Sequence, residues 1–295
     1  MKEQNKRILP KRPRLPDWIR IKPLIGTGRN HVSSVINNNS LNTVCQSAKC
    51  PNLNECWHKH TATFMILGKI CTRKCRFCSV CHGIPDKPDY LEPMHVAQAV
   101  KEINLKYVVI TSVTRDDLSD GGAQIFADTI KQIRELNGSN IKIEVLTPDF
   151  NCNLNALQTV LSAKPTVFNH NIETVRRLTS DIRFRATYDN SLYILKKAFE
   201  LSSGKIPIKS GLMVGLGETN SEVEQCIRDI RDTGATILTI GQYLPPSNNN
   251  WPLARYVHPE LFDEWKKIAY SLGFTTVASA PLVRSSYCAE ELLKK

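Results

Sequence analysis

Apolar positions along this chain follow two patterns that alternate. Short continuous runs rich in β-branched residues predict buried strands, and apolar side chains at helical spacing between those runs predict helices. The predicted strands are Thr63–Leu67, Tyr107–Thr111, Ile141–Leu146, Thr166–Phe168, Ile206–Val214 and Thr236–Ile240. The predicted helices are Ala97–Ile103, a helix that opens at Gly121, Leu154–Leu161, Ser191–Leu201 and Glu222–Arg231.

Strands that alternate with helices predict a parallel sheet joined by right-handed crossovers. Six strand–helix units lie within roughly 200 residues, whereas a complete eight-unit barrel typically needs about 250. The pattern therefore indicates an α/β fold with a partial (β/α)6 barrel. A doubly wound open sheet is the alternative. In both folds the chemistry belongs at the carboxyl ends of the strands.

The alternating pattern divides the chain into three regions. Residues 1–60 precede it as an N-terminal extension, residues 61–244 form the partial barrel, and residues 245–295 form a C-terminal extension. The C-terminal extension is expected to contain a helix near Pro259–Ser271 and a last strand at Phe274–Val277.

Composition and charge constrain the partners. The chain is 41% hydrophobic and 23% charged, which is typical of a globular protein, and its formal net charge is +11. A basic surface attracts an acidic partner, either nucleic acid or an acidic protein. No RNA-recognition or zinc-finger pattern accompanies the charge, so we expect no nucleic-acid partner. Without a long apolar run or signal-peptide core we expect no membrane association. The expected location is the bacterial cytoplasm, or the mitochondrial matrix if a transit peptide has been removed.

Cysteines are concentrated in one part of the chain. Six of the ten lie between Cys45 and Cys78. Such clustering in a long chain without a secretion signal favours metal or cluster ligation over a disulfide framework. The sequence leaves open the roles of the other four, Cys81, Cys152, Cys226 and Cys288.

Cys71, Cys75 and Cys78 form a C-x3-C-x2-C motif in the loop after the first predicted strand. Three thiolates in a tight loop can hold three irons of a 4Fe–4S cluster and leave the fourth iron open. An open iron can chelate S-adenosylmethionine (SAM), whose one-electron reduction yields methionine and a 5′-deoxyadenosyl radical. The context CTRKCRFC is similar to the signature of the radical SAM superfamily. A zinc knuckle completed by His82 is the alternative.

Cys45, Cys50 and Cys56 form another triad, C-x4-C-x5-C, which lies in the N-terminal extension and is the first of the two triads along the chain. This spacing is irregular for zinc, although His58 or His60 would complete a Cys₃His set. A second iron–sulfur cluster is chemically attractive because its bridging sulfide is a possible sulfur donor.

The sequence resembles the lipoyl synthase family across nearly its whole length. The two triads combined with a terminal RSSY are particular to that family. The other matching stretches are TSVTRDDLSDGGA, IEVLTPDF, VFNHNIETV, KSGLMVGLGET, LTIGQYLPPS, RYVHPE and PLVRSSY.

The resemblance implies a sulfurtransferase that inserts sulfur at C6 and C8 of an octanoyl group on a lysine of a lipoyl carrier domain. It implies two 4Fe–4S clusters and SAM as cofactors. The SAM cluster would be held by the second triad in the sequence, Cys71, Cys75 and Cys78. The auxiliary cluster would be held by Cys45, Cys50, Cys56 and a serine of RSSY, for which we choose Ser286 over Ser285. The RSSY segment is then expected to fold back to the first triad.

The resemblance also implies partners. The carriers would be acidic octanoylated domains, namely the glycine cleavage H protein and the E2 subunits of 2-oxoacid dehydrogenases. A ferredoxin or flavodoxin type protein would supply electrons, and an iron–sulfur carrier would repair the consumed cluster.

Four residues are candidates for contacts with SAM. Gly121 and Gly122 resemble a glycine segment that meets the methionine amino group, and a tight helix start is the alternative. Glu173 is a candidate for the ribose hydroxyls and Arg183 for the SAM carboxylate. A solvated surface group or a structural ion pair is the alternative for each of these charged residues.

The sequence departs from the family pattern at Cys81, Arg185, Asn250 and Cys288. None of these is among the six cysteines of the triads, so the departures concern substrate contacts. The rival functions are a transfer-RNA methylthiotransferase, a biotin synthase-like enzyme, and a zinc-stabilised nucleic-acid binding module. The two rival enzymes have a different domain plan or lack the N-terminal triad.

Overall fold

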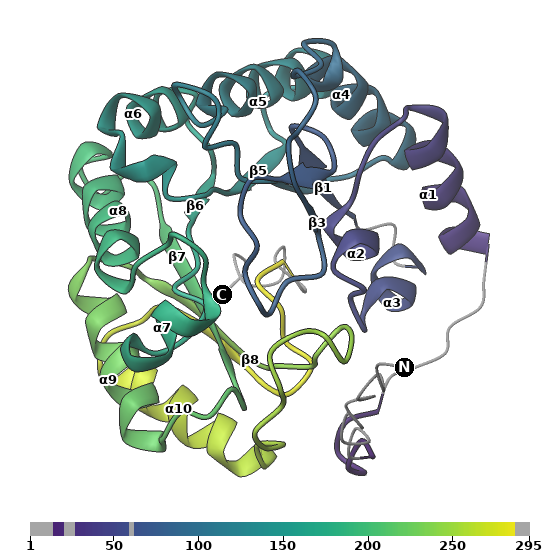
Figure 1. Ribbon diagram of the computed structural model, residues 1–295. Coiled ribbons are helices and arrows are strands. Elements are labelled where there is room, and N and C mark those ends of the chain that lie inside the picture. The colour runs from purple at the N-terminus through teal and green to yellow at the C-terminus, as the bar shows by residue number, and fades with distance from the viewer. Residues whose placement is uncertain (1–13, 21–26, 59–61, 287–295) are drawn as a thin grey trace, which may run out of the picture.

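A computed structural model describes residues 14–20, 27–58 and 62–286 of the chain (Figure 1). The strands are β1 (Thr63–Ile66), β2 (Ile70–Cys71), β3 (Cys81–His82), β4 (Tyr107–Ser112), β5 (Lys142–Leu146), β6 (Val167–Asn169), β7 (Ile208–Val214), β8 (Ile237–Gln242) and β9 (Thr276–Ser279). The helices are α1 (Thr27–Asn38), α2 (Val44–Ser47), α3 (Leu53–His58), α4 (Glu92–Ile103), α5 (Ala123–Asn137), the 3₁₀ helix η1 (Phe150–Cys152), α6 (Leu154–Ser162), α7 (Arg176–Ile182), α8 (Tyr188–Leu201), α9 (Asn220–Asp232) and α10 (Pro259–Ser271).

Seven parallel strands form one curved sheet in the order β1-β4-β5-β6-β7-β8-β9. Helices α4, α5, α6, α8, α9 and α10 lie along its outer side, and the C-terminal segment runs inside the arc (Figure 1). β1 and β9 are the two edges, so the described strands form an open, partial barrel. The predicted α/β class and partial barrel are confirmed.

The sheet has one strand more than the six predicted units. The sequence analysis assigned the last strand to the C-terminal extension, but β9 pairs with β8 in parallel register, with Ile237 opposite Thr276. The reason is packing: α10 brings the chain back along β8, and β9 buries Val277 in the common core. β9 is therefore part of the barrel sheet in space, although a long connection separates it from β8 in the sequence.

Helix boundaries differ from the predicted ones where polar capping residues extend a helix beyond its apolar stripe. α4 begins at Glu92 rather than Ala97, with a proline in its first turn, a position that proline favours. α9 begins at Asn220 because Thr219 and Glu222 form a capping box. The extension before the barrel also contains α1, which the sequence analysis did not predict.

Both extensions are fastened to the barrel. Met65 N in β1 donates to Asn42 O at 2.9 Å, which joins the segment before α2 to the edge strand. Asn52 Nδ2 donates to Leu282 O at 2.7 Å, so the N-terminal helices also hold the C-terminal segment. Gln242 N, at the end of β8, donates to Pro281 O at 3.1 Å. The two ends of the described chain therefore meet over the carboxyl edge of the sheet.

A buried ion pair links β5 to β7 across the intervening strand β6. Lys209 Nζ lies 2.8 Å from Glu144 Oε1, and both side chains are almost fully enclosed. Tyr107 OH and Asn169 Nδ2 donate to the same carboxylate at 2.7 and 2.9 Å. With these partners the buried charges of β5 and β7 are satisfied, as burial requires.

Candidate functional site

A cavity of about 1010 Å³ lies at the carboxyl ends of the strands. Its walls come from the segments after the strands, from the N-terminal helices and from the C-terminal segment. The wall residues that directly follow or end a strand include Val113 and Thr114 after β4, Thr147 to Asp149 after β5, His170 and Asn171 after β6, and Tyr243 and Leu244 after β8. This is the edge at which parallel α/β folds carry their sites.

The cysteines Cys71, Cys75 and Cys78 line this cavity from the loop after β1. Each sulfur accepts backbone N–H groups, which stabilise a thiolate. The donors are Arg73 N (3.4 Å) and Thr114 N (3.3 Å) for Cys71, Phe184 N (3.4 Å) for Cys75, and Val80 N (3.4 Å) for Cys78. Such N–H···S bonds suit cysteines that ligate an iron–sulfur cluster, because they balance the negative charge on sulfur.

Burial dominates the acidity of the Cys75 and Cys78 thiols. It raises the pKa of Cys78 to about 12, with the neighbouring Cys75 and Cys71 adding to the rise. Burial also raises the pKa of Cys75, whereas the N–H of Phe184 and the charge of Arg183 lower it. Thiols in such surroundings lose their protons when a cation binds, so cluster binding here would release protons.

A zinc site and an iron–sulfur cluster place different demands on the spacing of their ligands. Among the described residues, no three His, Cys, Asp or Glu side chains converge closely enough to hold a single metal ion. A tetrahedral zinc site needs that convergence. Cysteines of a 4Fe–4S cluster bind separate irons and do not need to converge on one point.

Arg73 anchors the loop between Cys71 and Cys75. Its guanidinium donates to Asp116 at 2.8 and 2.9 Å and to Asp149 at 2.7 and 2.8 Å. Burial by itself would raise the pKa of Asp149, but Arg73 outweighs it and brings the pKa to about 2. One buried cation therefore joins the cysteine loop to the segments after β4 and β5.

Glu173 and Arg183, predicted to contact SAM, both line the cavity. Burial raises the pKa of Glu173 while the charge of Arg183 lowers it, so the two groups are electrostatically coupled. Arg183 Nη1 donates to Ser191 Oγ at 2.7 Å and to Ile172 O at 3.2 Å, which orients the guanidinium. The structure thus brings both residues to the same cavity as the second triad.

Gly121 and Gly122, the other predicted SAM contacts, are not among the residues that line the cavity. Gly122 has φ +89° and starts α5, and a Cβ there would lie 2.2 Å from Leu67 Cδ1. A Cβ at Gly121 would meet Phe150 Cδ1 at 3.0 Å. The geometry accounts for these glycines by the tight helix start, which was the alternative interpretation. A SAM contact at this pair stays a prediction.

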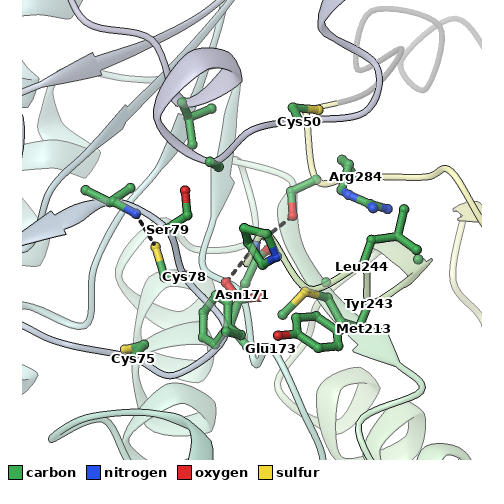
Figure 2. A pocket seen from close by; sticks show the side chains of 18 of the residues that line it. Cys50, Cys75, Cys78, Ser79, Asn171, Glu173, Met213, Tyr243, Leu244 and Arg284 are labelled. Carbon is green, nitrogen blue, oxygen red and sulfur yellow. Dashed lines mark hydrogen bonds between the residues drawn. The ribbon is translucent and has the colours of Figure 1, made fainter. Parts of the chain in front are cut away.

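The first triad approaches the cavity from the N-terminal helices. Cys45 in α2 and Cys50 in the turn after it line the cavity, and Cys56 in α3 packs against the core beside them. Burial raises the pKa of Cys45 to about 11. Burial also raises the pKa of Cys50, and the charge of Arg284 opposes that rise. In the view of Figure 2, Cys50 and Arg284 lie together, away from Cys75 and Cys78.

The described part of RSSY lies at the cavity, as the predicted fold-back requires. Ser285 and Ser286 both line it, and Asn171 Nδ2 donates to Ser285 Oγ at 2.7 Å (Figure 2). The segment sits closely on β8, since a Cβ at Gly241 would lie 2.1 Å from Val283 O. Ligation of iron by Ser286 stays a prediction. Tyr287 of RSSY and Cys288 lie outside the described residues.

Sequence reasoning did not assign a role to several residues that shape the site. Asn171 Nδ2 donates to Glu173 Oε1 at 3.1 Å as well as to Ser285 Oγ, so it links these two side chains in the cavity wall. Asn250, noted only as a departure from the family pattern, donates from Nδ2 to Cys78 O at 2.8 Å. Asp116 and Asp149 each follow a predicted strand, and that position was a usable signal.

None of the helices in the described part of the chain has the length and apolar character that a membrane span needs.

The comparisons with known proteins agree with this geometry. The family model described as the Radical SAM superfamily matches residues 65–230. The chain is 52% identical to a protein named lipoyl synthase from Caldicellulosiruptor saccharolyticus, over 95% of this chain and 97% of that protein. It is also 52% identical to a lipoyl synthase from Alkaliphilus metalliredigens, over 96% and 97%. Among solved structures, the FeFe-hydrogenase maturase HydG from Carboxydothermus hydrogenoformans shares the fold at TM-score 0.55 and 14% identity, covering 78% of this chain and 65% of that one.

Proposed function

The chain belongs to the lipoyl synthase family of radical SAM enzymes, and we propose that it inserts two sulfur atoms at C6 and C8 of an octanoyl group. The octanoyl group is amide-linked to a lysine of a lipoyl carrier domain. One observation carries this proposal: cysteines of both triads and the serines of RSSY line a single cavity, although they come from three distant parts of the chain. Membership of this family disfavours the RNA-modifying and zinc-module alternatives.

Two 4Fe–4S clusters fit the two groups of cysteines. We assign the SAM cluster to Cys71, Cys75 and Cys78, and the auxiliary cluster to Cys45, Cys50, Cys56 and Ser286. When bound, the SAM cluster would supply the electron that cleaves SAM to the radical that abstracts hydrogen. The auxiliary cluster would supply sulfide. The N–H donors around Cys71 and Cys75 support the assignment of the SAM cluster, and the shared cavity wall of Cys50 and Ser286 supports that of the auxiliary cluster.

Arg183 and Glu173 would each bind a different part of SAM, and Asn171 would position Glu173. Arg183 presents a buried positive charge beside Cys75 and Glu173, which suits a carboxylate ligand such as that of methionine. Glu173 can accept hydrogen bonds from ribose hydroxyls. Asn171 holds Glu173 in place and fixes the distance between this end of the cavity and RSSY.

Apolar side chains between the two ends suit a saturated acyl chain. Met213, Tyr243 and Leu244 line the cavity there (Figure 2). Tyr243 OH donates to Trp251 O at 2.8 Å, so its polar atom is satisfied within the protein. Each methylene buried from water contributes about 0.8 kcal/mol, which favours an acyl chain in this position. Exclusion of water also protects a radical reaction from side reactions.

The finer partners follow from the reaction. We propose acidic octanoylated carriers, such as the H protein and E2 subunits, a ferredoxin or flavodoxin type electron donor, and an iron–sulfur carrier for repair. The net charge of +11 favours acidic proteins. The proposed location is the bacterial cytoplasm, where thiols stay reduced.

Mass spectrometry of the carrier tests this function. The protein, prepared anaerobically, is incubated with an octanoylated carrier domain, SAM and dithionite. We expect a carrier whose mass, after reduction, has gained two sulfur atoms with no net change in hydrogen, together with 5′-deoxyadenosine; the oxidised cyclic disulfide form has two hydrogens fewer. A reaction that contains the protein, the carrier and dithionite but no SAM serves as the control. An unchanged octanoyl group, or protein that contains zinc and no iron, would contradict the proposal.

A further inference from the structure

Three exposed cations surround one short segment beside the second triad. Lys74 Nζ lies 5.2 Å and Arg185 Cζ 5.4 Å from the ring centroid of Phe184. Arg76 joins them, because its N–H donates to Ile182 O at 2.8 Å in the same segment. Its guanidinium lies 4.3 Å from the ring centroid of Trp251. Lys74, Arg76 and Arg185 together are called the cationic patch.

The charges of the cationic patch are not neutralised by the protein around them. Across the described ranges, none of its three side chains has a carboxylate within ion-pair distance, whereas Arg176 and Arg177 nearby are paired. All three side chains are exposed. Arg185 also has φ +62°, a left-handed conformation that is uncommon outside glycine. The intrinsic backbone preference of arginine therefore does not explain the conformation at Arg185.

The cationic patch lies one residue away from a proposed cluster ligand. The ring of Phe184 contacts the cations of Lys74 and Arg185, and the backbone N–H of Phe184 donates to Cys75 Sγ at 3.4 Å. None of the three cations lines the cavity. A partner bound on the cationic patch is thus close to the cysteine loop without entering the space that the octanoyl group needs.

We propose that the cationic patch is the docking surface for a small acidic one-electron carrier protein. This inference rests on the proposed function, which consumes an electron that the chain's amino acids cannot supply. In the step, one electron leaves the reduced donor, which is oxidised by one electron, and enters the cluster held by the second triad. No proton or covalent bond is transferred. An unpaired cationic surface next to Cys75 complements an acidic donor and speeds its encounter.

The lipoyl carrier is the competing occupant of this surface. A carrier has to deliver an acyl chain into the cavity, and the cationic patch stands outside the cavity wall. A redox donor needs only proximity. The position of Phe184, between the exposed cations and the Cys75 sulfur, favours the donor.

The test removes two charges and measures binding and electron supply separately. The double variant Lys74→Gln/Arg185→Gln is titrated with a fluorescently labelled acidic flavodoxin at low ionic strength, under anaerobic conditions. We expect the Kd to rise about tenfold, within the range by which electrostatic steering changes association. Formation of 5′-deoxyadenosine driven by reduced flavodoxin should fall correspondingly at subsaturating donor, whereas formation driven by dithionite should stay at the wild-type rate.

A matched control removes two charges elsewhere. Lys106 and Lys142 are exposed at the amino ends of β4 and β5, the opposite edge of the sheet, so Lys106→Gln/Lys142→Gln should leave the flavodoxin Kd unchanged. Equal iron content and unfolding temperature verify that both variants fold.

Wild-type flavodoxin affinity in the Lys74/Arg185 variant would overturn the proposal. So would an unchanged flavodoxin affinity with a raised KM for the octanoylated carrier under dithionite. Failure of the proposed function would appear differently, as absence of lipoyl product from wild-type protein with dithionite.

Discussion

Arg73 occupies the middle of the C-x3-C spacing, so its side chain starts from the same loop as the cysteines on either side. Its planar guanidinium forks to two carboxylates at once, a geometry that lysine does not reproduce. Asp116 and Asp149 are themselves buried. The loop position is therefore set by charge-assisted bonds to the segments after β4 and β5, and not by its own short sequence.

We expect Arg73→Lys to lower the free energy of unfolding by about 3 kcal/mol, since one buried carboxylate then loses its donors. The unfolding temperature, measured anaerobically, reports the change at roughly 2–4 °C per kcal/mol. Arg177→Lys is the matched control, because Arg177 pairs with Glu222 on the surface and such pairs contribute at most about 1 kcal/mol. Equal unfolding temperatures for the two variants would contradict the anchoring role.

Single residues were predictable from the sequence where several of one kind recur at short spacing. The cysteine triads have that property, and Glu173 stands in VFNHNIETV, a stretch that resembles the family. Asn250 has no such signal, because its contact with Cys78 spans 172 positions. Asn250 is the last of three consecutive asparagines, and only the folded chain shows that it binds the Cys78 carbonyl.

Glu92 shows how one element positions the next. It opens α4, and its carboxylate accepts the N–H of Leu67 at 2.6 Å, in the turn that leaves β1 toward the second triad. Leu67 and Gly68 both have left-handed backbones, at φ +68° and +87°. Burial raises the pKa of Glu92 to about 7, although the N–H groups of Leu67 and Gly68 lower it in part. The folded protein thus holds a proton on Glu92 that the unfolded chain releases.

A raised carboxyl pKa makes folding lose stability as pH rises toward and through that pKa. We expect the free energy of unfolding to fall by about 1 kcal/mol between pH 6.5 and 8 on account of Glu92. His170 contributes in the opposite direction at the lower end of this window: burial lowers its pKa to about 4, so its stabilising contribution is lost as pH falls through about 6.5 toward 4.

The variant Glu92→Gln should lose this part of the pH slope, because glutamine does not titrate. Glu264→Gln, an exposed position on α10, should keep the wild-type slope and serves as the control. Anaerobic unfolding at several pH values between 6.5 and 8 measures both. An identical slope in the wild type and in Glu92→Gln would contradict the protonated carboxyl.

Elements were predictable where apolar periodicity dominates, as in β4 and α5. Predicted boundaries were less accurate where polar residues cap a helix, as at Thr219 and Glu222. α1 was missed because its apolar positions are sparse, and its packing against α3 and α4 stabilises it only in the folded chain. The place of β9 in the sheet depends on α10, so the local sequence of β9 did not determine it.

At the scale of the whole molecule, three distant segments complete one cavity. α2 and the turn after it bring Cys45 and Cys50, the loops after the strands bring Cys71, Cys75 and Cys78, and the C-terminal segment brings Ser285 and Ser286. The contact between Asn52 and Leu282 joins the two ends of the described chain across this cavity. The family resemblance predicted the fold-back of RSSY, whereas the hydrogen bonds from Asn52 to Leu282 and from Asn171 to Ser285 required the structure.

The most direct test of the account compares Cys50→Ala with Cys75→Ala under dithionite, SAM and an octanoylated carrier. Quantifying 5′-deoxyadenosine and lipoyl product in the same reactions separates SAM cleavage from sulfur insertion. The account predicts that Cys50→Ala still produces 5′-deoxyadenosine but no lipoyl group, because only the sulfur source is lost. It predicts that Cys75→Ala produces neither. Lipoyl product from Cys50→Ala at the wild-type rate would contradict the claim that the N-terminal triad holds the sulfur donor.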